Sequence, residues 1–264
     1  MEKAPESQRP LHNLAWVYSE RMGRYDKALQ LYEKSLKLSE HRTYHKCMTL
    51  NNMANIYYQR GNYKKAIEFW EAAVGTCPEY ETPHYRIALS LTRLGKWEKA
   101  LAHLEEIILK RPGFCDYLNL KGFILLKQKR FDEALPYFRK CLKLNPDYKK
   151  AMINMGASFC LVGEYNRAEW FLRVTSSRFP KDVLTLLWLI EVNLRTDDKE
   201  DADRYMDKLF ALVNVNELVS TLKKFPENEN MAPVSQDLLN QAIAGRLTLR
   251  AEMIARLGDP LSDQ

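Results

Sequence analysis

The sequence has no apolar stretch long enough to cross a lipid bilayer. A transmembrane helix needs about 20 predominantly apolar residues, and the longest such run here, near Leu184–Ile190, is far shorter. The opening segment MEKAPESQRP also lacks the apolar core of a secretory signal peptide. These absences predict a cytoplasmic protein or the soluble part of a longer one, with no direct membrane insertion.

Motifs for catalysis and metal binding are also missing. The five cysteines are odd in number and show no C-x-x-C spacing, so we expect no disulfide framework. The sequence contains no G-x-x-x-x-G-K-[ST], no G-x-G-x-x-G and no G-x-S-x-G pattern. His41 and His45 are four residues apart, but no third metal ligand lies nearby. We therefore predict no catalytic residue, no metal and no cofactor, and hence a protein that is not an enzyme.

The positively charged residues are in excess, but they are not clustered in one part of the sequence. The net charge is +6 and the isoelectric point about 8.9. The basic residues occur in scattered pairs, such as Lys64-Lys65 and Lys149-Lys150, and acidic residues lie between them. A phosphate-binding surface needs a basic stripe or patch. We interpret the charges as solvated helix faces and do not expect a nucleic acid partner.

Glycine and proline are few, but together with alanine they recur at a fixed interval. Alanine occurs every 34 residues at Ala66, Ala100, Ala134, Ala168 and Ala202, and Ala28 precedes the first of these by 38. Proline keeps the same step at Pro78, Pro112, Pro146 and Pro180. An aromatic residue stands three positions before the alanine at Tyr25, Tyr63, Trp97, Phe131 and Tyr165. A period of this length indicates a repeat architecture.

Each copy reads as two short helices joined by a tight turn. In the copy that runs from residue 50 to residue 78, the first helical face is formed by Leu50, Met53, Ala54 and Tyr57, and the second by Ala66, Ile67, Trp70, Ala73 and Val74. Gly61 lies between the faces, where the chain must leave the helical conformation. Helices joined so closely must be antiparallel and in contact. We expect Ala54 and Ala66 at their crossing, because a larger side chain would not fit there. Pro78 then ends the second helix.

This pattern resembles the tetratricopeptide repeat, a helix-turn-helix unit that stacks into a superhelix. The matching residues in the second copy are Leu50, Met53, Ala54, Tyr57, Gly61, Tyr63, Ala66, Trp70, Ala73 and Pro78. The resemblance implies an all-α fold, a right-handed superhelical solenoid of antiparallel helix pairs. Its six repeats would span residues 11–38, 50–78, 84–112, 118–146, 152–180 and 184–212. A disordered lead is expected at residues 1–10, and C-terminal capping helices with a short tail at residues 213–264.

The C-terminal part predicts two further helices. One covers Val215–Phe225, a loop follows at Pro226–Pro233, and the final helix begins with Ser235 as its N-cap. The apolar positions of the final helix are Leu239, Ala242, Ile243, Met253, Ile254 and Leu257. Three roles are open for it: it caps the sixth repeat, it docks into the protein's own groove, or it pairs with a second chain in self-association.

In the family that this pattern resembles, the first helix of each repeat lines the concave side. That resemblance selects a candidate binding surface consisting of Asn13, Trp16, Asn51, Asn52, Asn55, Tyr58, Tyr85, Arg86, Leu89, Arg93, Asn119, Phe123, Lys127, Ile153, Asn154 and Ala157. Asparagine both donates and accepts hydrogen bonds, so a row of asparagines can hold the backbone of an extended peptide.

Two variants of the family bear on this surface. Asn13, Asn52 and Asn154 match in register the asparagine ladder in the repeat domain of O-linked N-acetylglucosamine transferases, and Arg86 and Leu120 interrupt it. The chaperone-type carboxylate clamp needs bases where this chain has Asn51, Asp116 and Leu120. Capture of a chaperone tail is therefore not expected.

The favoured function is a non-enzymatic interaction module or scaffold that binds a peptide or partner protein in its concave groove. The alternative is a targeting or assembly domain of a larger enzyme or membrane protein, such as a glycosyltransferase with a repeat tail.

Overall fold

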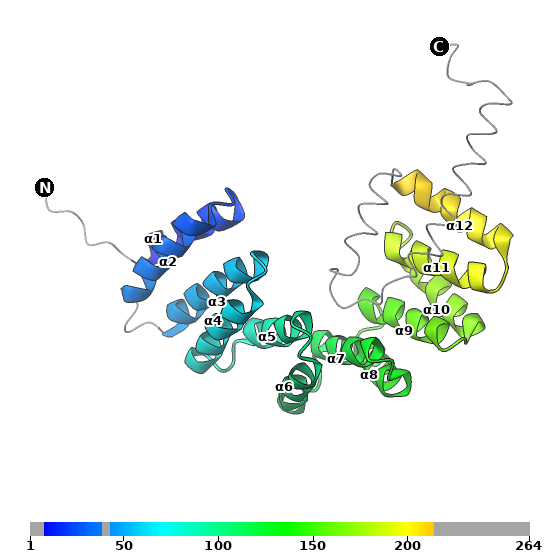
Figure 1. The fold of residues 1–264 in the computed structure, drawn as a ribbon, viewed down its shortest axis with the longest axis horizontal. Helices are drawn as coiled ribbons and strands as arrows, with labels where there is room; N and C mark the ends of the chain where they lie inside the picture. Colours follow the sequence, from blue (N-terminus) through cyan, green and yellow to red (C-terminus); the bar gives the residue numbers. More distant parts are fainter. Residues whose placement is uncertain (1–7, 39–42, 214–264) are drawn as a thin grey trace, which may run out of the picture. The chain divides into compact units, whose positions relative to one another are not determined.

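The computed structural model describes residues 8–38 and 43–213, which form twelve α-helices and no strand (Figure 1). The chain divides into two compact units, residues 1–117 and residues 118–264. The helices are α1 (Gln8–Glu20), α2 (Tyr25–Lys37), α3 (Thr43–Gln59), α4 (Tyr63–Thr76), α5 (Glu81–Arg93), α6 (Trp97–Lys110), α7 (Cys115–Lys127), α8 (Phe131–Leu144), α9 (Lys149–Leu161), α10 (Tyr165–Arg178), α11 (Val183–Arg195) and α12 (Lys199–Leu212).

Consecutive helices pack in pairs within each unit. In unit 1 (residues 1–117) the pairs are α1 with α2, α3 with α4, and α5 with α6. In unit 2 (residues 118–264) α9 packs on α10, and α11 packs on α12. The second helix of a pair also packs on the first helix of the next pair, as α4 does on α5 and α10 on α11. The all-α fold of repeated helix pairs is thus confirmed.

Small residues stand where the two helices of a pair cross. Ala54 and Ala66 have no exposed surface. In unit 2 the approach is closer: a methyl group built on Gly122 would lie 2.6 Å from Cε1 of Phe138, and one on Gly156 would lie 2.6 Å from Cγ of Leu172. Phe138 and Leu172 are fully buried. The second helix therefore fills the space that the small residue of the first helix leaves.

The turn inside each pair uses the left-handed backbone conformation. Gly61 has a φ angle of 73° and Gly163 one of 85°. Two repeats lack the glycine, and there Lys129 and Asp197 adopt φ angles of 60° and 57°. Tertiary packing thus imposes the same turn on residues that do not favour it.

Two helices begin earlier than their repeats predict. α1 begins at Gln8, three residues before Leu11. Pro10 is compatible with this start, since it lies in the first helical turn, where its missing N–H is not needed. α3 begins at Thr43, so the expected connection from Ser39 to Lys46 is partly helical. The remainder of the predicted lead, the helix at Val215–Phe225, the loop after it and the final helix lie outside the described residues.

Candidate functional site

The first helices of unit 1 are joined side by side by polar contacts. Nδ1 of His12 in α1 lies 2.9 Å from Oγ1 of Thr49 in α3, and Nδ2 of Asn52 lies 3.4 Å from Nε2 of His12. The Arg86 guanidinium of α5 lies over the Tyr58 ring of α3, 5.6 Å from its centre. The contacts hold α1, α3 and α5 in one row.

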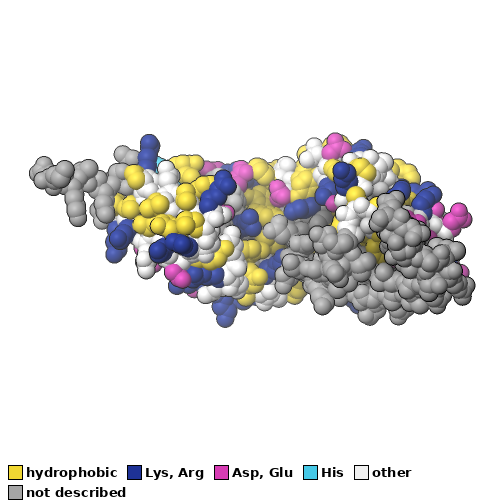
Figure 2. Space-filling model, turned by 90° about the horizontal axis from the view of Figure 1, so that it is seen from above, with side chains coloured by type: hydrophobic (Ala, Val, Ile, Leu, Met, Phe, Trp, Pro, Cys, Tyr) yellow, Lys and Arg dark blue, Asp and Glu magenta, His cyan; other side chains and the backbone are white. Residues whose placement is uncertain are grey.

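This row carries a surface that we call the N-terminal face. Its members are polar or aromatic and accessible to solvent: Asn13, Trp16, Asn52, Asn55, Tyr58, Tyr85, Arg86 and Arg93. Asn13 and Trp16 are exposed, and the other six are partly exposed. Figure 2 shows hydrophobic side chains gathered on the N-terminal part of unit 1. In α1, the apolar side chains of Leu14, Trp16 and Val17 are exposed. The surface combines amide donors and acceptors, two cations and several large rings.

Asn51, which the sequence placed on this surface, lies behind it. Its side chain is 5% exposed, and its Oδ1 accepts a hydrogen bond of 3.1 Å from Nε1 of Trp70. Its Nδ2 donates to Oδ1 of Asn52 at 3.4 Å. Asn51 therefore links the second helix α4 to the N-terminal face and orients Asn52.

His12 supports this site, although it lies outside the surface predicted from the sequence. Because the Asn52 amide donates to Nε2, the His12 proton lies on Nδ1 and is donated to Thr49, whose hydroxyl donates in turn to the His45 carbonyl at 2.8 Å. Burial, and then the nearby His45, lower the pKa of His12 below its ordinary value of 6.5, which favours this neutral form. A signal was available: because Asn13 matches Asn52 in register, His12 takes the register of Asn51, a position that the sequence did select.

In unit 2 the selected asparagines contact each other. Nδ2 of Asn154 donates to Oδ1 of Asn119 at 3.0 Å, and both side chains are buried. Phe123 is 7% exposed, while Lys127 is exposed with its ammonium 5.8 Å from the Phe123 ring. These residues lie in unit 2, whereas the residues of the N-terminal face belong to unit 1.

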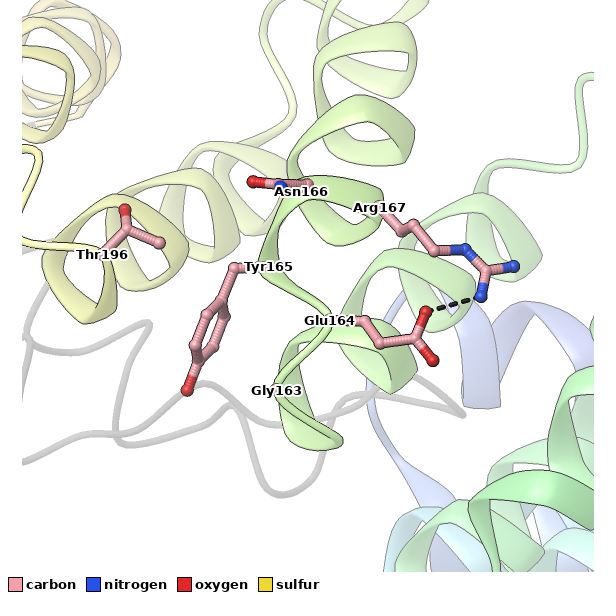
Figure 3. Close-up of a pocket in the computed structure, with 6 residues that line it drawn as sticks. All are labelled: Gly163, Glu164, Tyr165, Asn166, Arg167 and Thr196. Atoms are coloured by element: carbon pink, nitrogen blue, oxygen red, sulfur yellow. Dashed lines mark hydrogen bonds and ion pairs between the residues drawn. The ribbon is translucent and has the colours of Figure 1, made fainter.

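A hollow in unit 2 follows from the repeat itself. It is lined by Gly163, Glu164, Tyr165, Asn166, Arg167 and Thr196. In Figure 3 the side chains of Glu164 and Arg167, which form an ion pair of 2.5 Å, point toward one another and away from Tyr165. A hollow with the same register occurs three repeats earlier, lined by Arg60, Gly61, Asn62, Tyr63, Lys64 and Leu94. A feature that returns with the period reflects helix-turn geometry and gives no indication of a particular ligand.

Within residues 8–38 and 43–213, no helix is long and apolar enough to span a bilayer. The same residues hold no group of three or more side chains that could bind a metal ion.

The family models match along most of the repeat region. The model described as the tetratricopeptide repeat matches residues 115–148, and that of anaphase-promoting complex, cyclosome, subunit 3 matches residues 21–107. A solved tetratricopeptide repeat protein from Parabacteroides merdae aligns with a TM-score of 0.67 over 78% of this chain and 80% of its own, at 18% identity. The chain is a tetratricopeptide repeat protein.

Other known proteins share parts of the sequence or fold. BBSome complex member BBS4 of Bos taurus is 24% identical over 207 residues, which are 75% of this chain and 37% of that protein. Protein O-mannosyl-transferase TMTC1 of Homo sapiens is 25% identical over 140 residues, 53% of this chain and 15% of that protein. The tetratricopeptide protein YrrB, described as having an unusual peptide-binding site, aligns with a TM-score of 0.51 at 22% identity over 67% of this chain and 89% of its own. The chain thus spans less than two fifths of either curated relative.

Proposed function

We propose that this tetratricopeptide repeat protein is a non-enzymatic interaction module that binds an extended peptide or a partner protein on its N-terminal face. The fold is a protein-interaction scaffold, and similar solved structures include a protein with a peptide-binding site. The observation that carries the proposal is the row of accessible amide, aromatic and guanidinium groups on α1, α3 and α5.

The groups on the N-terminal face suit a particular class of ligand. Asn52 and Asn55 offer donors and acceptors to the main chain of an extended peptide, whatever its sequence. Arg86 and Arg93 favour acidic side chains, which a guanidinium can bind bidentately. Trp16 supplies a large exposed ring, the kind of side chain that dominates binding energy at interfaces. The ligand proposed is therefore an extended acidic segment with at least one apolar anchor.

An affinity capture with matched variants tests this proposal. Partners captured by the wild type are compared with those captured by an Asn52→Ala, Asn55→Ala, Arg86→Ala variant. The control is Lys64→Ala, Glu71→Ala, Glu105→Ala, which alters exposed residues of the second helices α4 and α6. We expect a set of partners that the control retains and the face variant loses. Equal recovery of every partner by all three proteins would remove the proposal.

A second candidate function is a targeting or assembly domain within a larger enzyme or membrane protein. The observation that favours it is the match to an O-mannosyl-transferase, of which this chain spans 15%. The second candidate requires a longer native polypeptide. An antibody against the repeats would then detect in cell extracts a chain larger than 30.9 kDa, the mass of residues 1–264, that also contains an enzyme or a membrane-spanning region.

A further inference from the structure

The first helices of unit 2 are buried on every side. In α9 each residue from Ala151 to Cys160 is buried, and in α11 each residue from Leu184 to Asn193 is buried. A helix on the surface of a repeat array normally keeps one polar, solvated stripe. The stripe is absent from the described parts of these two helices.

A comparison with α3 shows that the described helices do not account for this burial. α3 packs on α1, α2 and α4 and meets α5 through Tyr58. α9 packs on α8, α10 and α11 and meets α7 through Asn154. Each helix therefore contacts the second helix of its own pair, both helices of the preceding pair and the first helix of the next pair. Asn52 and Asn55 nevertheless stay partly exposed in α3, whereas the residues in the same register of α9, Asn154 and Ala157, are 0% exposed. The side that is open on α3 is therefore covered on α9.

We call the covered surface the C-terminal face: Asn154, Ala157 and Cys160 of α9 with Trp188 and Glu191 of α11. Trp188 and Glu191 take the register of Asn52 and Asn55, yet they are 0% and 1% exposed. Oε1 of Glu191 accepts hydrogen bonds of 2.9 and 2.7 Å from Nε and Nη2 of Arg195. This face is mostly apolar with one carboxylate, which suits an apolar helix that also carries a cation.

We propose that the C-terminal segment, residues 234–264, lies with its helix on the C-terminal face and acts as an internal ligand of unit 2. The burial belongs to a single chain, so neither a second copy nor a bound peptide is needed to produce it. The segment belongs to the chain that continues from α12, which ends at Leu212 in the same unit. The intervening residues 214–233, at about 3.3 Å each when extended, allow the chain to turn back over α11 and α9.

The sequence of the segment matches the chemistry of the C-terminal face. Its apolar positions include Leu239, Ile243 and Ile254, which fall on one side of a helix at 100° per residue. Arg246 and Arg250 fall on that same side and offer cations to the Glu191 carboxylate. Of the three roles open from the sequence, this selects docking into the protein's own groove.

The proposal is independent of the function proposed for the N-terminal face. The C-terminal segment covers α9 and α11, and it leaves α1, α3 and α5 accessible to a partner. A ligand of unit 2 would have to displace the C-terminal segment first.

The thiol of Cys160 reports whether the C-terminal face is covered. It is 2% exposed, and burial, followed by the nearby Glu191 carboxylate, raises its pKa to about 12. In full-length Leu239→Asp, Ile243→Asp protein, we expect the rate of Cys160 labelling by a maleimide, followed by peptide mass mapping, to rise at least about tenfold. Gln241→Asp, on the opposite side of the segment, should label at the wild-type rate. An unchanged Cys160 rate in the double variant would overturn the proposal.

A second cysteine and a second experiment separate uncovering from unfolding. Cys141 of α8 is 0% exposed and should stay protected in the double variant if the repeats remain folded. If both cysteines are labelled, a second experiment tests whether the C-terminal segment binds the repeats. A protease site is inserted between Pro226 and Pro233 of the otherwise wild-type chain, and the chain is cleaved there. After cleavage, the fragment should co-elute with a repeat body of monomeric mass in size-exclusion chromatography with light scattering. Immediate separation with Cys160 still protected, or a dimeric body, would contradict the proposal.

Discussion

At the scale of single residues, neighbouring amides have different roles. Asn51 and Asn52 are adjacent in α3, yet Asn51 accepts the hydrogen bond of a buried indole while Asn52 lies on the accessible N-terminal face. The helix turns the two side chains 100° apart, so one points toward α4 and the other toward α1. Substitutions at these positions should therefore separate stability from binding.

Replacing Asn51 by alanine should lower the free energy of unfolding by about 1–3 kcal/mol, because the Nε1–H of Trp70 would be left buried without its acceptor. Urea denaturation followed by circular dichroism measures the change. Asn55→Ala, at a partly exposed position of the same helix, should stay within about 0.5 kcal/mol of the wild type. Equal effects of the two substitutions would contradict the structural role of Asn51.

The buried His12 and the half-buried His103 should make unit 1 less stable in acid. Burial lowers the pKa of His12 and of His103 below 6.5, with further lowering by His45 and His84 respectively. Above pH 6.5 both histidines are neutral in the folded and in the unfolded protein. As the pH falls from 6.5 toward the lower folded-state pKa, the unfolded chain binds protons that the folded chain does not, and stability is lost. Denaturation at pH 7 and pH 5 should show this loss, and it should be smaller in His12→Asn, His103→Gln protein than in the wild type.

At the scale of helix pairs, the close approach of the two helices limits the size of the side chain at their crossing. Gly156→Ala should destabilise the protein by about 1–3 kcal/mol, because the added methyl would lie 2.6 Å from Cγ of the buried Leu172. Gly75→Ala in α4 is the matched control, since nothing lies within 4 Å of an added methyl there. The control should be neutral or stabilise by up to about 1 kcal/mol. Thermal unfolding of the two variants measures the contrast, and similar melting temperatures would disprove the close approach.

Glycine substitutions in the turns of the fourth and sixth repeats should stabilise the protein. Lys129 and Asp197 hold φ angles of 60° and 57°, a conformation that costs a side-chain-bearing residue about 1–2 kcal/mol. Lys129→Gly and Asp197→Gly should each raise the free energy of unfolding by about 0.5–1 kcal/mol after the greater flexibility of the unfolded chain is subtracted. Gly61→Ala should have the opposite sign, because it places a side chain at φ 73°. A loss of stability in both glycine variants would show that the lysine and aspartate are needed for other contacts.

The sequence predicts what is local and periodic. The alanine that recurs every 34 residues locates the helix crossing, and the glycine before it locates the turn. The crossing and the turn can be predicted because each depends on contacts within a single repeat of about 34 residues. The 34-residue period does not predict side-chain contacts that are made between only one particular pair of repeats. The His12 link to Asn52 spans 40 residues and the Asn154 bond to Asn119 spans 35, and each needs the relative rotation of two helices to be known. The burial of α9 and α11 on every side has no periodic signal, because α3 keeps Asn52 and Asn55 partly exposed in the same register.

At the scale of the whole molecule, stability should be uneven. Each repeat contacts its neighbours, so a terminal repeat has support from one side. α1 leaves Leu14, Trp16 and Val17 exposed, whereas α9 and α11 are buried throughout their central turns. Native-state hydrogen exchange should therefore be fastest in α1 and slowest in α9 and α11. Uniform protection from α1 to α12 would contradict this gradient.

The constant step between crossings also governs how such a chain can change in length during evolution. Deleting residues 84–117 would bring Leu118 into the place of His84, and every crossing and turn downstream would keep its partner. Deleting a single residue inside a helix would rotate the rest of that helix by 100° and turn its apolar side outward. Insertions and deletions that survive selection should therefore come in whole repeats, with shorter changes confined to the connections between pairs.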